Sequence, residues 1–241
     1  MSTKALYLAD TYLFQSSAKV EGIEQDEQGL AVILDQTIFY PQGGGQPTDI
    51  GVITSNSAEF QVNKVLYRPD GAIAHYGSMV KSEMKVGDEV SLSIDKDRRL
   101  LNARNHSAGH MLDFAVEKHY PQLVGIKGYH FPEGPYVEFE GSLSDEEKEQ
   151  LPMVIQEAVQ EMVTQEQPVT TRLVEAEELA KLCKHVLPNL PKDKPTRAMI
   201  VGDLALGCGG THISNAKEVG SFIVRKVKKE QEKVRISYAI G

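Results

Sequence analysis

The chain has 241 residues, of which 41% are hydrophobic and 25% are charged, so it is long enough for one large domain or two modest ones. Its formal net charge of −8 argues against a strongly basic nucleic-acid-binding protein, although basic side chains can still gather locally. No apolar run approaches the roughly 20 residues that cross a membrane, and the first residues lack the pattern of a secretory signal.

Residues 1–94 are predicted to form a β-rich domain. Residues 30–34 make a compact apolar run, and apolar and polar residues alternate over 90–94 as in a half-buried strand. Asp70-Gly71 is typical of a hairpin turn, and further glycines recur at intervals that suit short strands. The best arrangement for such a segment is a small antiparallel barrel.

A run of glycines interrupts this domain at Gly43-Gly44-Gly45-Gln46. Three successive glycines favour neither a helix nor a central strand, so the segment is predicted to be a loop. The loop could be a plain flexible turn. It could also bring backbone amides and a glutamine close to a ligand, and we therefore take Gly44, Gly45 and Gln46 as candidate substrate-binding residues.

The second predicted domain covers residues 95–241 and opens with a helix. Apolar residues between 100 and 116 follow a helical period, and Pro121 lies just beyond the last of them. His106 and His110 are four residues apart, which places both imidazoles on one face of that helix, one turn from each other. Such a pair can hold one metal ion, but the spacing by itself is weak evidence.

Shorter elements follow the histidine helix. Two strands joined by a Pro-Glu-Gly turn are predicted, and Ser144 with Glu147 forms the capping box of a second helix. Pro152 should kink or restart that helix, because proline lacks the amide hydrogen. The predicted elements are strands over 125–131 and 136–139, a short helix over 175–183, a Pro-rich loop from Pro188 to Pro195, and strands over 197–201, 220–227 and 234–240.

A second pair of metal-binding residue types lies far downstream. Cys208 and His212 have the same four-residue offset and stand among glycines, which allow the backbone to wrap closely around an ion. Together with His106 and His110 they supply the four nitrogen and sulfur ligands of a tetrahedral zinc site. Cys183 follows helical leucines and is interpreted as a core residue. Because two cysteines do not suggest a disulfide framework, a reducing compartment fits.

The remaining histidines have no partner at ligand spacing. His75, His119, His130 and His185 are each interpreted as structural or exposed. Asp113 could accept a hydrogen bond from a ligating imidazole, or it could simply be solvated.

Basic residues gather locally in two places. Arg98, Arg99 and Arg104 precede the first histidine pair, and several lysines and arginines lie within 225–235. Both groups could be solvated faces, which is the usual reading of charge runs, or they could contact phosphates.

The order of these motifs resembles a known family. His106-Ser-Ala-Gly-His110 followed by Cys208-Gly-Gly-Thr-His212 is similar to the editing domain of alanyl-tRNA synthetases, and most of all to the freestanding AlaX editing proteins. The segment Phe39 to Gly51 resembles the Gly-rich motif of the longer AlaX proteins. The resemblance therefore covers nearly the whole chain.

The resemblance implies an α+β protein in which a small antiparallel β-barrel precedes an α/β-sandwich editing domain of the threonyl/alanyl-tRNA synthetase type. It implies an ATP-independent, cytoplasmic hydrolase that removes the wrong amino acid, serine and also glycine, from tRNA specific for alanine. It further implies one zinc per chain and a substrate contact from Thr211. Some family members carry Thr or Ser after the first helix, whereas this chain has Lys127-Gly128-Tyr129-His130, so no residue is assigned to sense the hydroxyl.

Several questions stay open at this stage. The zinc ion could activate water, bind the substrate's amino group or be structural, since four protein ligands leave no open position. No general base is assigned, because the Glu of a His-Glu-x-x-His motif is missing. The alternatives are a non-catalytic zinc-containing tRNA-binding protein and an editor of another aminoacyl-tRNA, such as a threonyl-type editor. No oligomeric state is assigned.

Overall fold

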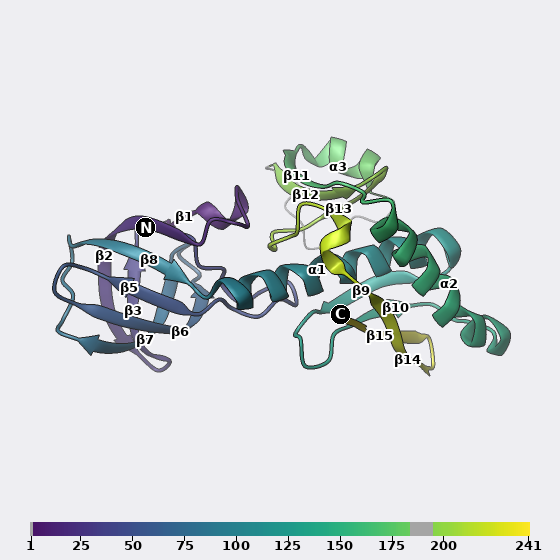
Figure 1. Ribbon diagram of the computed structural model, residues 1–241, viewed down its shortest axis with the longest axis horizontal. Coiled ribbons are helices and arrows are strands. Elements are labelled where there is room, and N and C mark those ends of the chain that lie inside the picture. Colours follow the sequence, from purple (N-terminus) through teal and green to yellow (C-terminus); the bar gives the residue numbers. More distant parts are fainter. Residues whose placement is uncertain (1, 184–194) are drawn as a thin grey trace. The chain divides into compact units, whose positions relative to one another are not determined.

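The computed structural model describes residues 2–183 and 195–241, and the chain divides into two compact units, residues 1–101 and 102–241 (Figure 1). The predicted loop from Pro188 to Pro195 falls outside the described residues except for its last residue, and so does His185. Among the described residues, no helix combines the length and the apolar character needed to cross a membrane.

The first unit is built on a closed antiparallel barrel, as predicted. Its six strands neighbour one another in the order β2 (Gln15–Asp26), β3 (Gly29–Leu34), β7 (Ile73–Lys81), β6 (Glu59–Tyr67), β5 (Gly51–Thr54) and β8 (Glu89–Ile94). The short strands β1 (Lys4–Ala5) and β4 (Gln36–Thr37) pair in parallel beside the 3-10 helix η1 (Leu6–Leu8).

Alternating side chains explain why these segments form a barrel. Every second residue of β8 is buried, and Val90, Leu92 and Ile94 join the apolar core of the unit. The predicted hairpin at Asp70-Gly71 joins β6 to β7, and Gly71 has a φ of +86° there.

Helix α1 (Lys96–His119) begins in the first unit, where Arg99 ties it to the barrel segment. The Arg99 side chain is fully buried and forms an ion pair with Asp49, with Nε 3.0 Å from Oδ2. Its guanidinium also donates hydrogen bonds to the carbonyl oxygens of Thr11 and Ile38. The interpretation of this basic group as a solvated face is therefore wrong for Arg99.

The described residues of the second unit form two antiparallel sheets, three α-helices, of which α1 begins in the first unit, and one 3-10 helix. One sheet has the order β14 (Phe222–Glu230), β15 (Lys233–Ile240), β10 (Tyr136–Glu140) and β9 (Val124–Tyr129), and the other has the order β11 (Val169–Val174), β12 (Thr196–Val201) and β13 (Leu204–Gly207). Apolar residues of α1 and α2 (Asp145–Thr164) share one core with the inward face of the four-stranded sheet (Figure 1). The short helices are α3 (Ala176–Leu182) and the 3-10 helix η2 (Ala216–Val219). This architecture confirms the predicted α+β class.

Helix α2 begins at the predicted capping box, with Ser144 as the N-cap and Glu147 returning the hydrogen bond. It continues through Pro152 as one helix, so the expected restart does not occur. Proline removes a single intrahelical hydrogen bond, and burial of Leu151 and Ile155 on either side offsets that loss.

Candidate metal centre

Helix α1 supplies the first two side chains of the predicted metal site. His106 and His110 are 1% and 8% exposed, and their ring centroids are 4.7 Å apart. The neighbouring residues Met111 and Leu112 are fully buried in the core of the unit, which fixes the rotation of the helix. Core packing thus presents both imidazoles on one side, as the four-residue spacing predicts.

The loop after β13 supplies the other two side chains, and hydrogen bonds hold this loop on both sides. Cys208 N donates to the carbonyl oxygen of Arg197, and the guanidinium of Arg197 donates to the carbonyl oxygens of Cys208 and Gly210. On the helix side, Ser107 Oγ accepts from the amide of Ile213 and lies 3.3 Å from Nδ1 of His212. Segments about 100 residues apart in the sequence are therefore joined by specific contacts.

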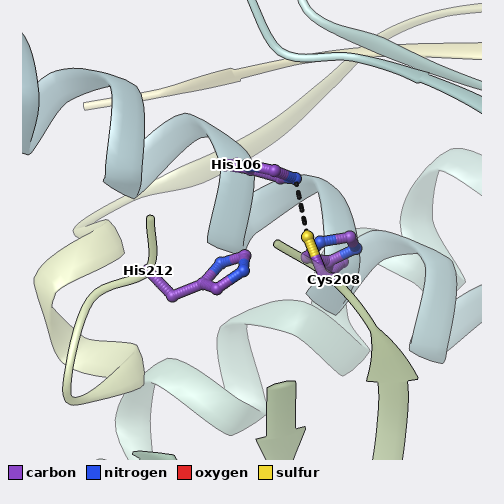
Figure 2. Close-up of side chains that lie close together, drawn as sticks. His106, Cys208 and His212 are labelled. Carbon is purple, nitrogen blue, oxygen red and sulfur yellow. Dashed lines mark hydrogen bonds between the residues drawn. The ribbon is translucent and has the colours of Figure 1, made fainter. Parts of the chain in front are cut away.

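The four predicted ligands converge on one point. Figure 2 shows His106, Cys208 and His212 facing one another, with Nε2 of His106 3.5 Å from Sγ of Cys208. One ligand atom from each residue lies within 4.8 Å of all the others in a group that could hold a metal ion, named here the His/Cys cluster: His106, His110, Cys208 and His212. Tetrahedral zinc places its ligands roughly 3.4–3.7 Å apart, so the group is only slightly wider than a loaded site.

The electrostatics of the His/Cys cluster suit a cation. Burial lowers the pKa of His110 to about 4 and holds the pKa values of His106 and His212 well below the usual value, so the rings are neutral with a lone pair available. Nε2 of His110 is buried and has no hydrogen-bond partner within the described ranges. Such an orphaned acceptor costs free energy unless something binds it. Burial also raises the pKa of Cys208, and a bound divalent cation would reverse that effect.

A fourth imidazole, that of His130, lies against the cluster. His130 is 2% exposed, and its ring stacks on that of His106 with a centroid distance of 4.5 Å. The hydroxyl of Tyr238 donates to the carbonyl oxygen of Asn105 at 2.8 Å, so it accepts at 2.9 Å from Nδ1 of His130. These bonds leave the lone pair of His130 on Nε2.

Two glycines make room for this ring. A Cβ atom on Gly109 would lie 2.3 Å from Cε1 of His130, and a Cβ atom on Gly128 would lie 2.3 Å from its Nε2. His130 stands at no ligand spacing from the members of the cluster, so its contact with them was not predicted from the sequence. Gly109 was the sequence feature that indicated a close neighbour, because glycine is unfavourable inside a helix unless close packing requires it.

The other candidate residues are placed as follows. Thr211 is fully buried in the same loop as Cys208 and His212. Gly44, Gly45 and Gln46 belong to the first unit. Gly44 and Gly45 have φ values of +53° and +76°, and residues 43 and 46 exchange backbone hydrogen bonds, so the predicted loop is a tight turn with a buried Gln46.

Asp113 does not orient an imidazole. No hydrogen bond joins its carboxylate to a histidine in the part of the chain that the structure describes. The carboxylate packs instead against Gly125, where a Cβ atom would lie 2.6 Å from its Oδ1. Burial, with a smaller effect of Glu117, raises the pKa of Asp113 to about 7. Cys183 is 5% exposed in a small apolar cluster, which confirms its interpretation as a core residue.

Comparison with known proteins gives consistent matches. A model of the family described as tRNA synthetases class II (A) matches residues 5–98. The alanyl-tRNA editing protein AlaX-M of Methanosarcina barkeri is 32% identical, and the alignment covers 98% of both chains. AlaX-L of Pyrococcus horikoshii is 30% identical over 98% of this chain and 57% of its own length. An alanine–tRNA ligase of Archaeoglobus fulgidus is 30% identical, and there the chain spans 26% of the relative. The chain thus spans about half of AlaX-L and about a quarter of that ligase.

Proposed function

The chain belongs to the family of freestanding alanyl-tRNA editing proteins, and from this premise we propose that it hydrolyses mischarged tRNA specific for alanine. The observation that carries the proposal is the convergence of the His/Cys cluster within 4.8 Å from two distant segments. We place the activity in the cytoplasm, where the substrate is made.

The reaction is hydrolysis of the ester between an amino acid and the terminal ribose of tRNA. A water oxygen bonds to the carbonyl carbon, the bond from that carbon to the ribose oxygen breaks, and the ribose oxygen takes the proton released by the water and becomes a hydroxyl. Serine is the proposed amino acid, with glycine as a second substrate. An apolar pocket built for alanine rejects serine poorly, so a second site that reads the hydroxyl is useful.

One zinc ion per chain is the proposed cofactor. When bound, it would supply positive charge near the ester carbonyl, the water or the substrate's amino group. The chain's own groups would prepare the ligands: Ser107 Oγ can accept a hydrogen from Nδ1 of His212 and leave the other nitrogen for the ion. Arg197 holds the loop that carries Cys208. Thr211 and the turn of residues 43–46 are proposed to contact the substrate.

The test of the function is a deacylation panel. Purified protein is incubated with seryl-, glycyl- and alanyl-tRNA specific for alanine and with seryl-tRNA specific for threonine, before and after treatment with a chelator. We expect serine to be removed at least tenfold faster than alanine, and chelation to abolish the reaction. Comparable rates for seryl and alanyl forms would leave an unspecific esterase. Turnover of a noncognate threonine-specific substrate alone would favour a threonyl-type editor, and no turnover with zinc retained would favour a tRNA-binding protein.

The zinc assignment has its own measurement. Elemental analysis of the purified chain should give about one zinc per molecule, with strong loss in Cys208→Ala and His110→Ala. Cys183→Ala is the matched control, because Cys183 is also a free cysteine but is buried in a different apolar cluster. Full zinc occupancy in both ligand variants would show that the assignment is wrong.

A further inference from the structure

The outward face of the four-stranded sheet carries an unusual set of side chains. Residues alternate along β10 and β15, so that Val137, Phe139, Val234 and Ile236 pack in the core while Tyr136, Glu138, Arg235 and Ser237 face away from it. The register places Tyr129, Tyr136, Ser237 and Lys226 in one row of this face, and Lys127, Glu138, Arg235 and Lys228 in the next.

Three aromatic rings on this face form a stack. The rings of Phe131 and Tyr129 are 4.5 Å apart and nearly parallel, and Tyr136 lies 5.2 Å from Tyr129 at an interplanar angle of 18°. The guanidinium of Arg235 covers Tyr136 at 4.4 Å. All three rings keep some solvent exposure. A stack of this kind can be extended by any unpaired nucleobase, since every base has a π face.

The charge of this face is opposite to that of the chain. By register it carries five basic and three acidic side chains, whereas the whole chain has 26 Lys and Arg against 34 Asp and Glu. Two of the acidic side chains, Glu138 and Glu230, are already ion-paired with Arg235 and Lys228. Positive potential beside a ring stack is the combination that binds the phosphates and bases of single-stranded nucleic acid.

The stack is also directly connected to the metal centre. His130 stands between Tyr129 and Phe131 in the sequence, and its ring stacks on His106 of the His/Cys cluster. The two neighbouring rings stack on each other instead, so successive side chains leave the backbone on opposite sides. The ring stack and the imidazole that contacts His106 therefore come from the same short segment of chain, residues 129–131, on its two opposite sides.

We propose that this outward face, named here the ring face, binds the unpaired 3′ end of tRNA, with bases on the ring stack and phosphates near Lys127 and Lys226. The inference rests on the proposed function, which supplies the tRNA. A duplex would hide its bases from the rings, and the ester to be hydrolysed sits at the end of the unpaired strand.

The first experiment measures binding of fluorescently labelled, uncharged tRNA specific for alanine to the full chain. Tyr129→Leu with Phe131→Leu keeps apolar side chains but removes two rings. We expect intact tRNA to bind roughly 5- to 150-fold more weakly to this variant. A tRNA that lacks its last three nucleotides is the matched ligand: it should bind wild-type protein more weakly than intact tRNA does, and the variant should lose little further affinity for it.

The second experiment reverses charge without touching the rings. Lys127→Glu with Lys226→Glu should reduce the slope of log Kd against log salt by about 1.4, since each phosphate contact to a single strand contributes about 0.7. Lys85→Glu with Lys148→Glu changes the charge equally at exposed positions elsewhere and should leave the slope unchanged. Zinc content and circular dichroism confirm that each variant is folded.

Unchanged affinity in the ring variant together with an unchanged slope in the Lys127/Lys226 variant would overturn the proposal. Equal losses for intact and truncated tRNA would also overturn it, because the rings would then not contact the 3′ end. Uncharged tRNA contains no ester, so this test is separate from the deacylase assignment. A chain that binds tRNA through the ring face but hydrolyses nothing would refute the function alone.

Discussion

Gly109 is the residue whose replacement best tests the packing of His130. Alanine in place of glycine normally stabilises a helix by about 1 kcal/mol. Here the new Cβ atom would lie 2.3 Å from Cε1 of His130 and 2.8 Å from the hydroxyl oxygen of Tyr238. We expect Gly109→Ala to destabilise the protein by about 1–3 kcal/mol, as overpacked cores do.

Thermal unfolding checks this prediction, and His130→Ala supplies the control. In the Gly109→Ala, His130→Ala double variant the closer contact is removed and only the hydroxyl of Tyr238 remains near the new methyl group, so Gly109→Ala should cost less on that background. A higher Tm for the single variant, as helix propensity alone predicts, would mean that His130 moves away freely.

His75 is expected to make the stability of the first unit depend on pH. Its Nδ1 donates to the carbonyl oxygen of Val32 at 2.9 Å, and its Nε2 accepts from the hydroxyl of Thr37 at 2.7 Å, which requires the neutral ring. Burial lowers the pKa of His75 to about 4. The folded state therefore binds fewer protons than the unfolded state between about pH 6.5 and pH 4.

The stabilisation by neutral His75 is fully present above the unfolded pKa and is lost as the pH falls toward 4, by about 3 kcal/mol. Urea unfolding at pH 7.5 and at pH 4.5 measures this loss, and comparison with His75→Asn separates it from the titration of other groups. Asparagine can still donate to Val32 but does not titrate. The same pH dependence in both proteins would contradict the prediction.

The convergence of the His/Cys cluster could be predicted from the sequence because its members fall into two pairs with the same four-residue spacing. His130 could not, because the hydroxyl that orients it belongs to Tyr238, 108 residues away. Arg99 was misread for a similar reason. Its charge is visible in the sequence, but its burial depends on Asp49, 50 residues earlier.

Residues 43–46 of the Gly-rich motif form a tight turn whose backbone geometry can be tested by substitution. Positive φ at both central positions and reciprocal hydrogen bonds between Gly43 and Gln46 are features of a type I′ turn. Valine is strained at positive φ, by roughly 1–2 kcal/mol per residue, whereas asparagine tolerates it.

We expect Gly44→Val with Gly45→Val to destabilise the first unit and to lose deacylation, while Gly44→Asn with Gly45→Asn stays close to wild-type stability. Chemical unfolding, zinc content and the rate on seryl-tRNA are measured for both. Zinc should be retained in each variant, because the His/Cys cluster lies in the other unit. Full activity in the valine variant would reduce this segment to a plain connection.

Strand β8 and helix α2 were predicted from their periods, whereas strand β11, which has none, was missed. Strand β8 alternates between buried and more exposed residues, and α2 buries one face at helical spacing from Leu151 to Val163. In β11 only the first and last residues, Val169 and Val174, are buried, so the strand has no alternation to detect. Antiparallel pairing with β12 holds this segment in the strand conformation, and its own side-chain pattern does not reveal that pairing.

At the scale of the whole molecule, the two units share helix α1. All residues of the His/Cys cluster belong to residues 102–241, whereas Arg99 on the same helix belongs to the first unit. We retain as a proposal the division into a barrel domain at 1–94 and a metal-binding domain at 95–241. That division cuts the contact between Arg99 and Asp49, with unequal consequences for the two fragments.

Fragment 95–241 should fold and hold about one zinc, because it contains all four ligands and frees Arg99 to be solvated. Fragment 1–94 keeps Asp49 in a site built for an ion pair, and an unpaired buried charge costs about 3–5 kcal/mol. We therefore expect 1–94 to be much less stable than 1–101, which restores Arg99, and Asp49→Asn to recover part of the loss in 1–94. Circular dichroism during urea unfolding and elemental analysis measure these differences.

Equal stability of 1–94 and 1–101 would refute the role of the ion pair. If fragment 95–241 lacks zinc while the full chain holds it, formation of the metal centre requires the first unit as well as the four ligands.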